Sequence, residues 1–194
     1  MSDNQTINGF QCEELERVKT SLQTNPENGQ FKLRAKNRWI DGAQSISLVS
    51  SFKGMGREFS ARNAPFIQTT DTPEILAGKD LGPTPMEELL VALAASVTTT
   101  LAYRASVANL QVQEIECDVE GDVEFQDVMN SSEPANSSFK QIRVTVHVKS
   151  DASKEQLTAL CAASPVLAAL TRPVAVSIAV KKTDDGSATV GAGL

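Results

Sequence analysis

The longest feature in the hydrophobic pattern runs from Thr84 to Ala108 and predicts a single helix. Thr84 suits the N-cap and Pro85 suits the first helical position, and two glutamates follow in the first turn, where the helix dipole favours negative charge. From Leu89 to Leu101 the residues are apolar or small on every side. A helix that lacks a polar face is buried all round, so we expect it at the centre of the fold, wrapped by sheet and by a second helix or a second subunit.

Segments with period-two alternation lie on both sides of this helix and predict strands. They are Phe31–Lys36, the neighbourhood of Ile46 and Leu48, Glu58–Gln68, Gln111–Phe125, Ile142–Val148 and Val174–Val180. Asp41-Gly42 is a hairpin signal between the first two. In Gln111–Phe125 the apolar residues share one face and the acidic residues share the other, which must be wet.

Two further segments predict helices. Leu15, Val18 and Leu22 recur at helical spacing, so we expect a short amphipathic helix whose apolar stripe packs on the body of the domain or on a partner chain. Ser153 and Gln156 form a capping box that opens the other helix. On that helix one buried stripe is predicted, made of Leu157, Leu160, Cys161 and Ser164, and Ser164-Pro165 is typical of a further helical start.

The order of these elements predicts an α+β fold, because it contains neither a βαβ repeat nor a Gly-rich phosphate loop. The chain has 194 residues, which favours one domain. We expect residues 1–30 to form a helical appendage and residues 31–194 to form the domain.

Composition excludes several function classes. The net charge of −6 argues against binding to nucleic acid or anionic lipid, which needs a basic patch. Three widely spaced cysteines and one histidine suggest neither a disulfide framework nor a metal centre, and no cofactor is indicated. The start is polar and lacks a signal peptide, and the run Leu89–Ala95 is too short to span a bilayer, so we expect a cytoplasmic protein that does not bind membranes.

Two hydroxyls occupy positions where chemistry is plausible. Ser96 lies in the middle of the apolar helix, and Ser164 lies on the buried stripe of the later helix. In the structural interpretation, Ser96 is a small residue whose hydroxyl bonds to the carbonyl four residues earlier. Ser164 is then a helix cap that stabilises the helix by about 1 kcal/mol. Spacing alone favours these structural roles.

The segment from Gly82 to Leu101, GPTPMEELLVALAASVTTTL, resembles the core motif of the OsmC/Ohr family of osmotically inducible and organic-hydroperoxide-resistance proteins. The resemblance covers roughly Phe31 to Val180. Phe31–Gly42, with Trp39, is similar to the opening strands of the family, and Asp71–Gly78 is similar to its lead-in loop. Ser164-Pro165-Val166 resembles the second helical motif, which is commonly Cys-Pro-Val.

This resemblance implies a fold in which antiparallel sheets wrap around a central buried helix and a second helix. It implies an intertwined homodimer with two sites at the subunit interface and a pocket for apolar peroxides. The chemistry of the family is thiol-based: one cysteine becomes a sulfenic acid, a second closes a disulfide, and an arginine and a glutamate assist.

The sequence departs from this pattern at each chemical position. Ser96 and Ser164 stand at the two cysteine positions, and the glutamate position falls on Met86 with Glu87 beside it. The arginine does not align, and its candidates are Arg38, Arg57 and Arg62. Peroxide reduction needs a sulfur that can be oxidised to sulfenic acid, and a serine oxygen cannot undergo that oxidation.

Three functional hypotheses follow from this departure. The first is a non-redox homodimer of the peroxide and osmotic-stress class, with an interface pocket for a small apolar molecule. The predicted pocket residues are Met86, Glu87, Leu89, Leu93, Ser96, Thr100 and Arg62.

The second hypothesis is an organic hydroperoxide reductase that uses the displaced thiol of Cys161, three residues before Ser164. The structural interpretation of that thiol is an inert buried cysteine, because apolar surroundings raise a thiol pKa. The third is a hydrolase with Ser96 as nucleophile, which needs a base. The single histidine, His147, is expected on the polar face of its strand and far away.

Overall fold

The computed structural model describes residues 5–60, 62, 64–125 and 138–182. The N-terminal half contains one helix and eight short strands. They are β1 (Thr6–Ile7), β2 (Phe10–Gln11), α1 (Cys12–Thr24), β3 (Lys32–Leu33), β4 (Lys36–Asp41), β5 (Gln44–Val49), β6 (Phe52–Gly54), β7 (Arg57–Phe59) and β8 (Phe66–Thr70). The C-terminal half contains α2 (Pro85–Val107), β9 (Val112–Val123), β10 (Phe139–Ser150), α3 (Lys154–Cys161) and α4 (Pro165–Thr171). Short 3₁₀ turns cover Pro26–Gly29 and Glu74–Leu76.

All strand pairs in the described residues are antiparallel. The sheets have the orders β1-β2, β3-β6-β7, β4-β5-β8 and β10-β9. The last is a long ribbon in which Cys117 of β9 lies opposite Val146 of β10. Apolar side chains of the ribbon face α2 and polar ones face solvent, as the alternation predicted. The α+β class expected from the sequence is therefore confirmed.

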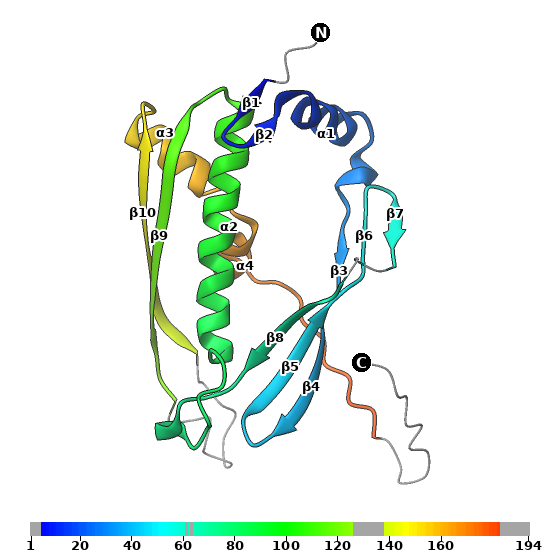
Figure 1. Cartoon of the computed structure of the whole chain (residues 1–194), viewed down its shortest axis with the longest axis vertical. Coiled ribbons are helices and arrows are strands. Elements are labelled where there is room, and N and C mark those ends of the chain that lie inside the picture. Colours follow the sequence, from blue (N-terminus) through cyan, green and yellow to red (C-terminus); the bar gives the residue numbers. More distant parts are fainter. Residues whose placement is uncertain (1–4, 61, 63, 126–137, 183–194) are drawn as a thin grey trace.

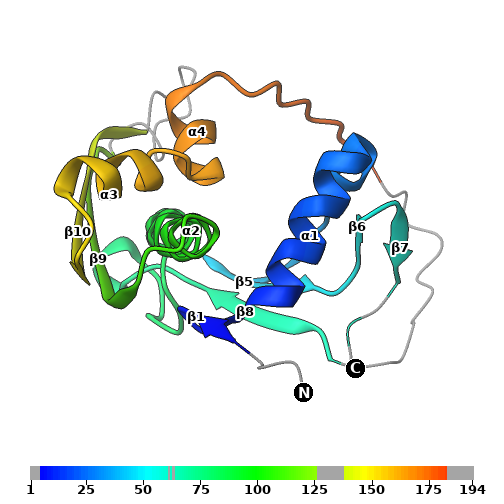
Figure 2. The same ribbon diagram turned by 90° about the horizontal axis from the view of Figure 1, so that it is seen from above.

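Helix α2 is the element around which the C-terminal half is organised (Figures 1 and 2). It packs against β9, α3 and α4. Seen from above in Figure 2, the helices α3 and α4 lie on one side of α2 and the sheet β4-β5-β8 passes beneath it, whereas α1 stands apart on the far side. Only one flank of α2 is therefore covered by this chain.

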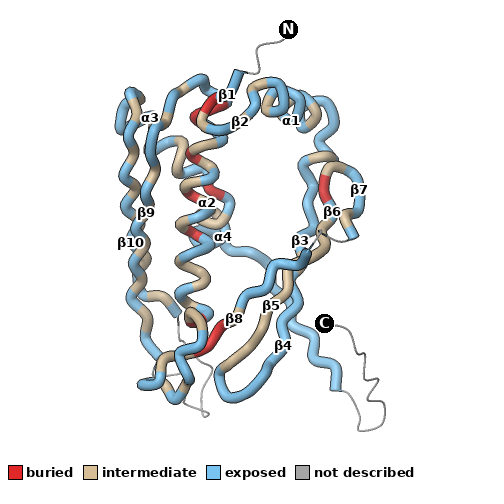
Figure 3. Tube along the Cα trace, viewed as in Figure 1, coloured by how far each residue is buried: buried red, intermediate tan, exposed pale blue. Residues whose placement is uncertain are grey.

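Within the single chain, α2 is buried along one stripe and not all round, and the expectation of burial on every side had included cover by a second helix or a second subunit. Its buried residues are Leu93, Val97, Leu101, Ala105 and Ser106. Figure 3 shows this buried stripe in red along a helix that is otherwise tan or blue. Pro85–Val107 is long and apolar enough to cross a membrane by length and composition, a test that the core helix of a soluble protein also passes.

Two strand predictions are also wrong. Glu58–Gln68 is not one strand, because β7 ends at Phe59 and β8 begins at Phe66, directly after Pro65, which has no N–H to donate. Phe31–Lys36 is divided between β3 and the first residue of β4.

The alternating segment Val174–Val180 forms no strand in the described chain. It runs extended after α4 and crosses toward the N-terminal half (Figures 1 and 2). Its side chains are nearly free of contacts: Val176 is 82 % exposed, Ile178 is 88 % exposed and Val180 is 90 % exposed. The alternation still predicts a strand, but among the described residues no neighbouring strand pairs with it.

The residues before α1 are fixed to the body rather than trailing from it. Asn8 has φ of 49° and donates from its side-chain amide to the Ser106 hydroxyl (3.0 Å) and to the Leu110 carbonyl (2.9 Å). The ring of Phe10 packs against that of Tyr103 in a tilted arrangement, with centroids 4.4 Å apart. Helix α1 itself has no buried residue, so its apolar stripe is uncovered in the single chain.

Candidate functional site

The start of α2 is fixed by its sequence. The Thr84 hydroxyl accepts a hydrogen bond from the Glu87 amide at 3.2 Å, and the Glu87 carboxylate accepts from the Thr84 amide at 2.7 Å. These reciprocal bonds form the capping box, and the Thr84 amide, together with the Thr84 hydroxyl that also donates to the carboxylate, holds the pKa of Glu87 below its usual range. From this fixed start, Met86, Leu89, Leu93 and Ser96 lie on one face of the helix.

The loop that leads into α2 is organised by a buried carboxylate. Asp71 is 1 % exposed and accepts from the backbone amides of Thr72 (2.8 Å), Lys79 (3.2 Å) and Leu81 (3.3 Å). These amides lower the pKa of Asp71, the Thr72 amide most of all. The Asp71 amide in turn donates to the carbonyl of Pro83 (3.2 Å), so the loop closes immediately before the N-cap of α2.

The two serines meet in space although they lie 68 residues apart in the chain. The Ser96 and Ser164 hydroxyl oxygens are 2.8 Å apart, a hydrogen-bond distance. Ser164 is fully buried and caps α4, because its hydroxyl accepts from the Leu167 amide at 3.3 Å. The Ser96 hydroxyl accepts a hydrogen bond from the Val166 amide at 3.4 Å. The structural interpretation had instead placed the bond of this hydroxyl within its own helix.

An apolar groove begins one turn before Ser96. Its volume is about 570 Å³, within the roughly 300–1,000 Å³ of small-molecule sites. It is lined by Met86, Leu89 and Leu93 of α2, by residues 138–142 and Val144 at the start of β10, and by Leu167, Leu170 and Thr171 of α4. The sequence analysis did not predict the lining residues from β10 and α4. Alternation shows which strand residues are apolar, but it does not show which helices cover them.

The remaining predicted pocket residues, Ser96 included, are not among the residues that line this groove. Glu87 caps α2. Thr100 is half-buried one turn beyond Ser96 and does not line the groove. The Arg62 guanidinium lies over the rings of Phe66 (4.8 Å) and Phe52 (5.3 Å) in the N-terminal half.

The other two arginine candidates belong to the same half. Arg57 lies over the ring of Phe59 at 4.5 Å, and Arg38 is exposed on β4. The single chain therefore does not bring any of the three arginine candidates into the groove.

Cys161 lies at the edge of a second groove, between α3 and the apolar face of β10. Burial raises the pKa of its thiol, and burial likewise raises the pKa of Cys117 across the ribbon. His147 is exposed on the polar face of β10, where its Nε2 is 3.3 Å from Asp118. The histidine thus lies on the opposite face of the ribbon from α2, as expected.

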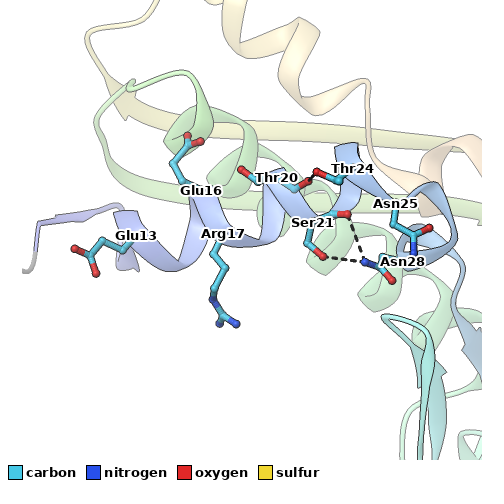
Figure 4. A pocket seen from close by; sticks show the side chains of 8 residues that line it. All are labelled: Glu13, Glu16, Arg17, Thr20, Ser21, Thr24, Asn25 and Asn28. Atoms are coloured by element: carbon cyan, nitrogen blue, oxygen red, sulfur yellow. Dashed lines mark hydrogen bonds between the residues drawn. The ribbon is translucent and has the colours of Figure 1, made fainter.

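A third hollow lies on the polar side of α1 (Figure 4). It is lined by polar and charged side chains of α1 and of the turn after it. Among these, the Asn28 side-chain amide donates a hydrogen bond to the Ser21 hydroxyl at 2.9 Å. It is open to solvent and shares no residue with the serine pair. In the described part of the chain no three His, Cys, Asp or Glu side chains gather as metal ligands.

The fold and site together define an α+β protein in which a central helix presents a hydroxyl to the cap of a second helix beside an apolar groove. Residues 78–179, just over half of the chain, match the family described as OsmC-like protein. The chain therefore belongs to the OsmC-like family, which is related to peroxide and osmotic-stress proteins. The matched range includes α2, both serines and the whole β9-β10 ribbon.

Solved structures show the same fold at low sequence identity. A Psychrobacter arcticus 273-4 protein assigned to the osmotic stress and detoxification response has a TM-score of 0.53 and 11 % identity, covering 71 % of this chain and 88 % of that one. An OsmC-like protein of Mycoplasma pneumoniae has a TM-score of 0.52 and 16 % identity, covering 72 % of this chain and 87 % of that one. No sequence among the curated proteins matches this chain.

Proposed function

We propose that this OsmC-like protein is a homodimer that binds a small apolar molecule and does not reduce peroxides at its serine pair. The observation that carries the proposal is the contact between Ser96 and Ser164, at 2.8 Å. The resemblance assigns the two family cysteines to these positions, and in this chain both carry oxygen. The architecture that would bring two thiols together is present, and the thiols are absent from it.

The environment of the pair also opposes hydrolysis. A serine nucleophile needs a base within hydrogen-bond reach. The described partners of Ser96 are a second hydroxyl and a backbone amide, and neither accepts a proton near neutral pH. His147 is engaged with Asp118 on the solvent face of the ribbon.

The groove beside the pair supports a binding role. Apolar residues of α2, β10 and α4 converge on it, and Gln141 and Thr171 add polar groups to its lining. Specific small-molecule sites commonly combine an apolar lining with a few placed polar groups.

Uncovered apolar surface supports the homodimer. The open flank of α2 includes Val91, 58 % exposed, and Tyr103, 47 % exposed. The stripe of α1 and the extended segment Val174–Val180 add further apolar side chains without partners in the described chain. An exposed apolar surface of this extent is typical of an interface, and a second copy offers the same surfaces in return.

The alternative is an organic hydroperoxide reductase that uses Cys161. One feature favours it: this thiol lines a groove next to the serine pair. However, burial raises the pKa of Cys161, which reduces the thiolate that attacks a peroxide.

Two measurements test the proposal. Size-exclusion chromatography with light scattering should give the mass of two chains, and a one-chain mass would remove the homodimer. Organic hydroperoxide consumption with a dithiol donor should be absent in the wild type and in Cys161→Ala. Turnover that disappears in Cys161→Ala, while Cys12→Ala retains it, would replace the proposal with the alternative.

A further inference from the structure

The second groove, which Cys161 lines, differs in charge from the first. Its volume is about 740 Å³, within the roughly 300–1,000 Å³ of small-molecule sites. Its apolar lining comes from α2, from three alternate residues of β10, and from α3 and α4. These residues are Val97, Val144, Val146, Val148, Leu157 and Leu167. The groove therefore has the size and the lining of a small-molecule site.

Lys154, the first residue of α3, is the only charged side chain among the described residues that line this groove. It is exposed, and in the described part of the chain no carboxylate lies within ion-pair distance of it. Its acidic neighbours in the sequence, Asp151 and Glu155, do not line the groove. The first groove also contains one lysine, but Lys140 lies 2.8 Å from Glu124. Of the two grooves as described, only the second therefore has an unpaired positive charge beside its apolar lining.

The two grooves adjoin, because Val144 and Leu167 line both of them. Lys154 comes shortly after Ser150, the last residue of β10, so its charge lies at the end of the second groove away from Val144. Between Val144 and Ser150 an extended strand spans about 20 Å, at about 3.4 Å per residue. A ligand that fills this space is elongated and has one end beside Lys154.

Charge also distinguishes between candidate occupants. The extended segment Val174–Val180 is apolar and exposed, which makes it a candidate to fill this groove in a second copy. However, Arg172 precedes this segment and Lys181 and Lys182 follow it, so its charges are repelled by Lys154. An anionic group is attracted to the same lysine, and the apolar lining favours an apolar chain attached to that group.

We infer that the second groove binds a single-chain amphiphile with an anionic head group. The head group forms an ion pair with the Lys154 ammonium, and the chain lies along Val148 and Val146 toward Leu167. This inference goes beyond the proposed function, because it concerns a different groove and a charged ligand and does not involve the serine pair.

Isothermal titration calorimetry with octanoate and 1-octanol tests the head group, because these probes share one chain length and differ in charge. An exposed ion pair changes Kd by about three- to fivefold, equivalent to about 1 kcal/mol or less. Lys154→Gln should therefore weaken octanoate binding about three- to fivefold and leave 1-octanol binding unchanged. Lys149→Gln is the matched control, since Lys149 is exposed on the polar face of β10, does not line the groove and should affect neither probe.

The thiol of Cys161 reports which groove is occupied. Iodoacetamide alkylation at alkaline pH, followed by peptide mass spectrometry, measures its accessibility. Octanoate at ten times its Kd should slow alkylation of Cys161 about tenfold, because the ligand covers the thiol in the occupied fraction. Cys12, on α1, is the internal control and should react at an unchanged rate. Leu170→Glu alters the first groove only and should leave the protection of Cys161 intact.

The combined results decide the inference. Equal effects of Lys154→Gln on both probes, or no effect on either, would overturn the anionic head group. Octanoate that does not bind, or that binds without protecting Cys161, would overturn the site. Protection of Cys161 that rises with protein concentration in the absence of octanoate would assign the groove to a second copy instead. The proposed ligand of the first groove stands or falls separately, because Leu170 lines that groove and not this one.

Discussion

The Ser96–Ser164 contact makes a quantitative prediction for stability. Ser164→Ala removes the N-cap of α4, a loss of about 1 kcal/mol, and also the hydrogen bond to Ser96, about 1 kcal/mol more. Because Ser164 is fully buried, water does not replace either bond. We expect the free energy of unfolding to fall by about 2 kcal/mol.

A matched control is available on the neighbouring helix. Ser153 caps α3 through the Gln156 amide at 3.3 Å and lies in an exposed position without a second buried partner. Ser153→Ala should therefore lower the free energy of unfolding by about 1 kcal/mol only.

The assay is urea unfolding followed by circular dichroism at one fixed protein concentration, since association affects apparent stability. The single variants Ser96→Ala and Ser164→Ala and their double variant complete a mutant cycle, in which we expect a coupling of about 1 kcal/mol. Equal losses for Ser164→Ala and Ser153→Ala, together with no coupling, would refute the paired arrangement of the hydroxyls.

Three further predictions concern the surroundings of the site. A Cβ at Gly78 would lie 1.8 Å from the Thr72 carbonyl oxygen, so Gly78→Ala should lower the free energy of unfolding by about 3 kcal/mol in urea, and a loss under 1 kcal/mol would contradict the loop geometry. Backbone amides lower the pKa of Asp71, so its ionised form stabilises the fold above about pH 4 and this stabilisation is lost as pH falls through the folded-state pKa. The difference in the free energy of unfolding between wild type and Asp71→Asn should therefore narrow between pH 6 and pH 3. A difference that stays constant over this range would contradict the stabilising role of the ionised Asp71. A Cβ at Gly121 would lie 2.3 Å from the Phe139 ring, so Gly121→Ala should lower the free energy of unfolding by about 1–3 kcal/mol in urea, and an unchanged stability would contradict the packing of this ring on the ribbon.

Local chemistry made the helix ends predictable from sequence. Thr84 is the N-cap of α2 as predicted, and Ser153 with Gln156 forms the capping box that their spacing indicated. Ser164 likewise caps α4 as predicted. These features depend on residues within one turn of each other, so a single sequence contains all the information they need.

Long-range features were harder to predict. Spacing alone gave no reason for Ser96 and Ser164, 68 residues apart, to touch; the expectation came from the family resemblance. The strand predicted at Val174–Val180 has the right alternation, but pairing requires a neighbour that the described chain does not supply. The same reason explains why α2, apolar on every side, is covered on one flank only.

Which residue takes the place of the family's arginine could not be predicted from the sequence for a related reason. Arg62 binds the rings of Phe52 and Phe66 in the N-terminal half, and spacing does not reveal such tertiary contacts. Asp71 was also missed as an organising residue, although Asp-Thr-Pro followed by glycine is a turn signal that indicates side-chain to backbone bonding.

The central claim is that the architecture for a thiol pair persists here and that oxygen in place of sulfur at its two positions removes the peroxide chemistry. The most direct measurement is organic hydroperoxide consumption with a dithiol donor by the double variant Ser96→Cys and Ser164→Cys, beside the wild type. Because the two oxygens are 2.8 Å apart, the introduced thiols are close enough to form a disulfide with a small adjustment. We predict turnover in the double variant and none in the wild type; turnover in the wild type, or none in a folded double variant, would contradict the account.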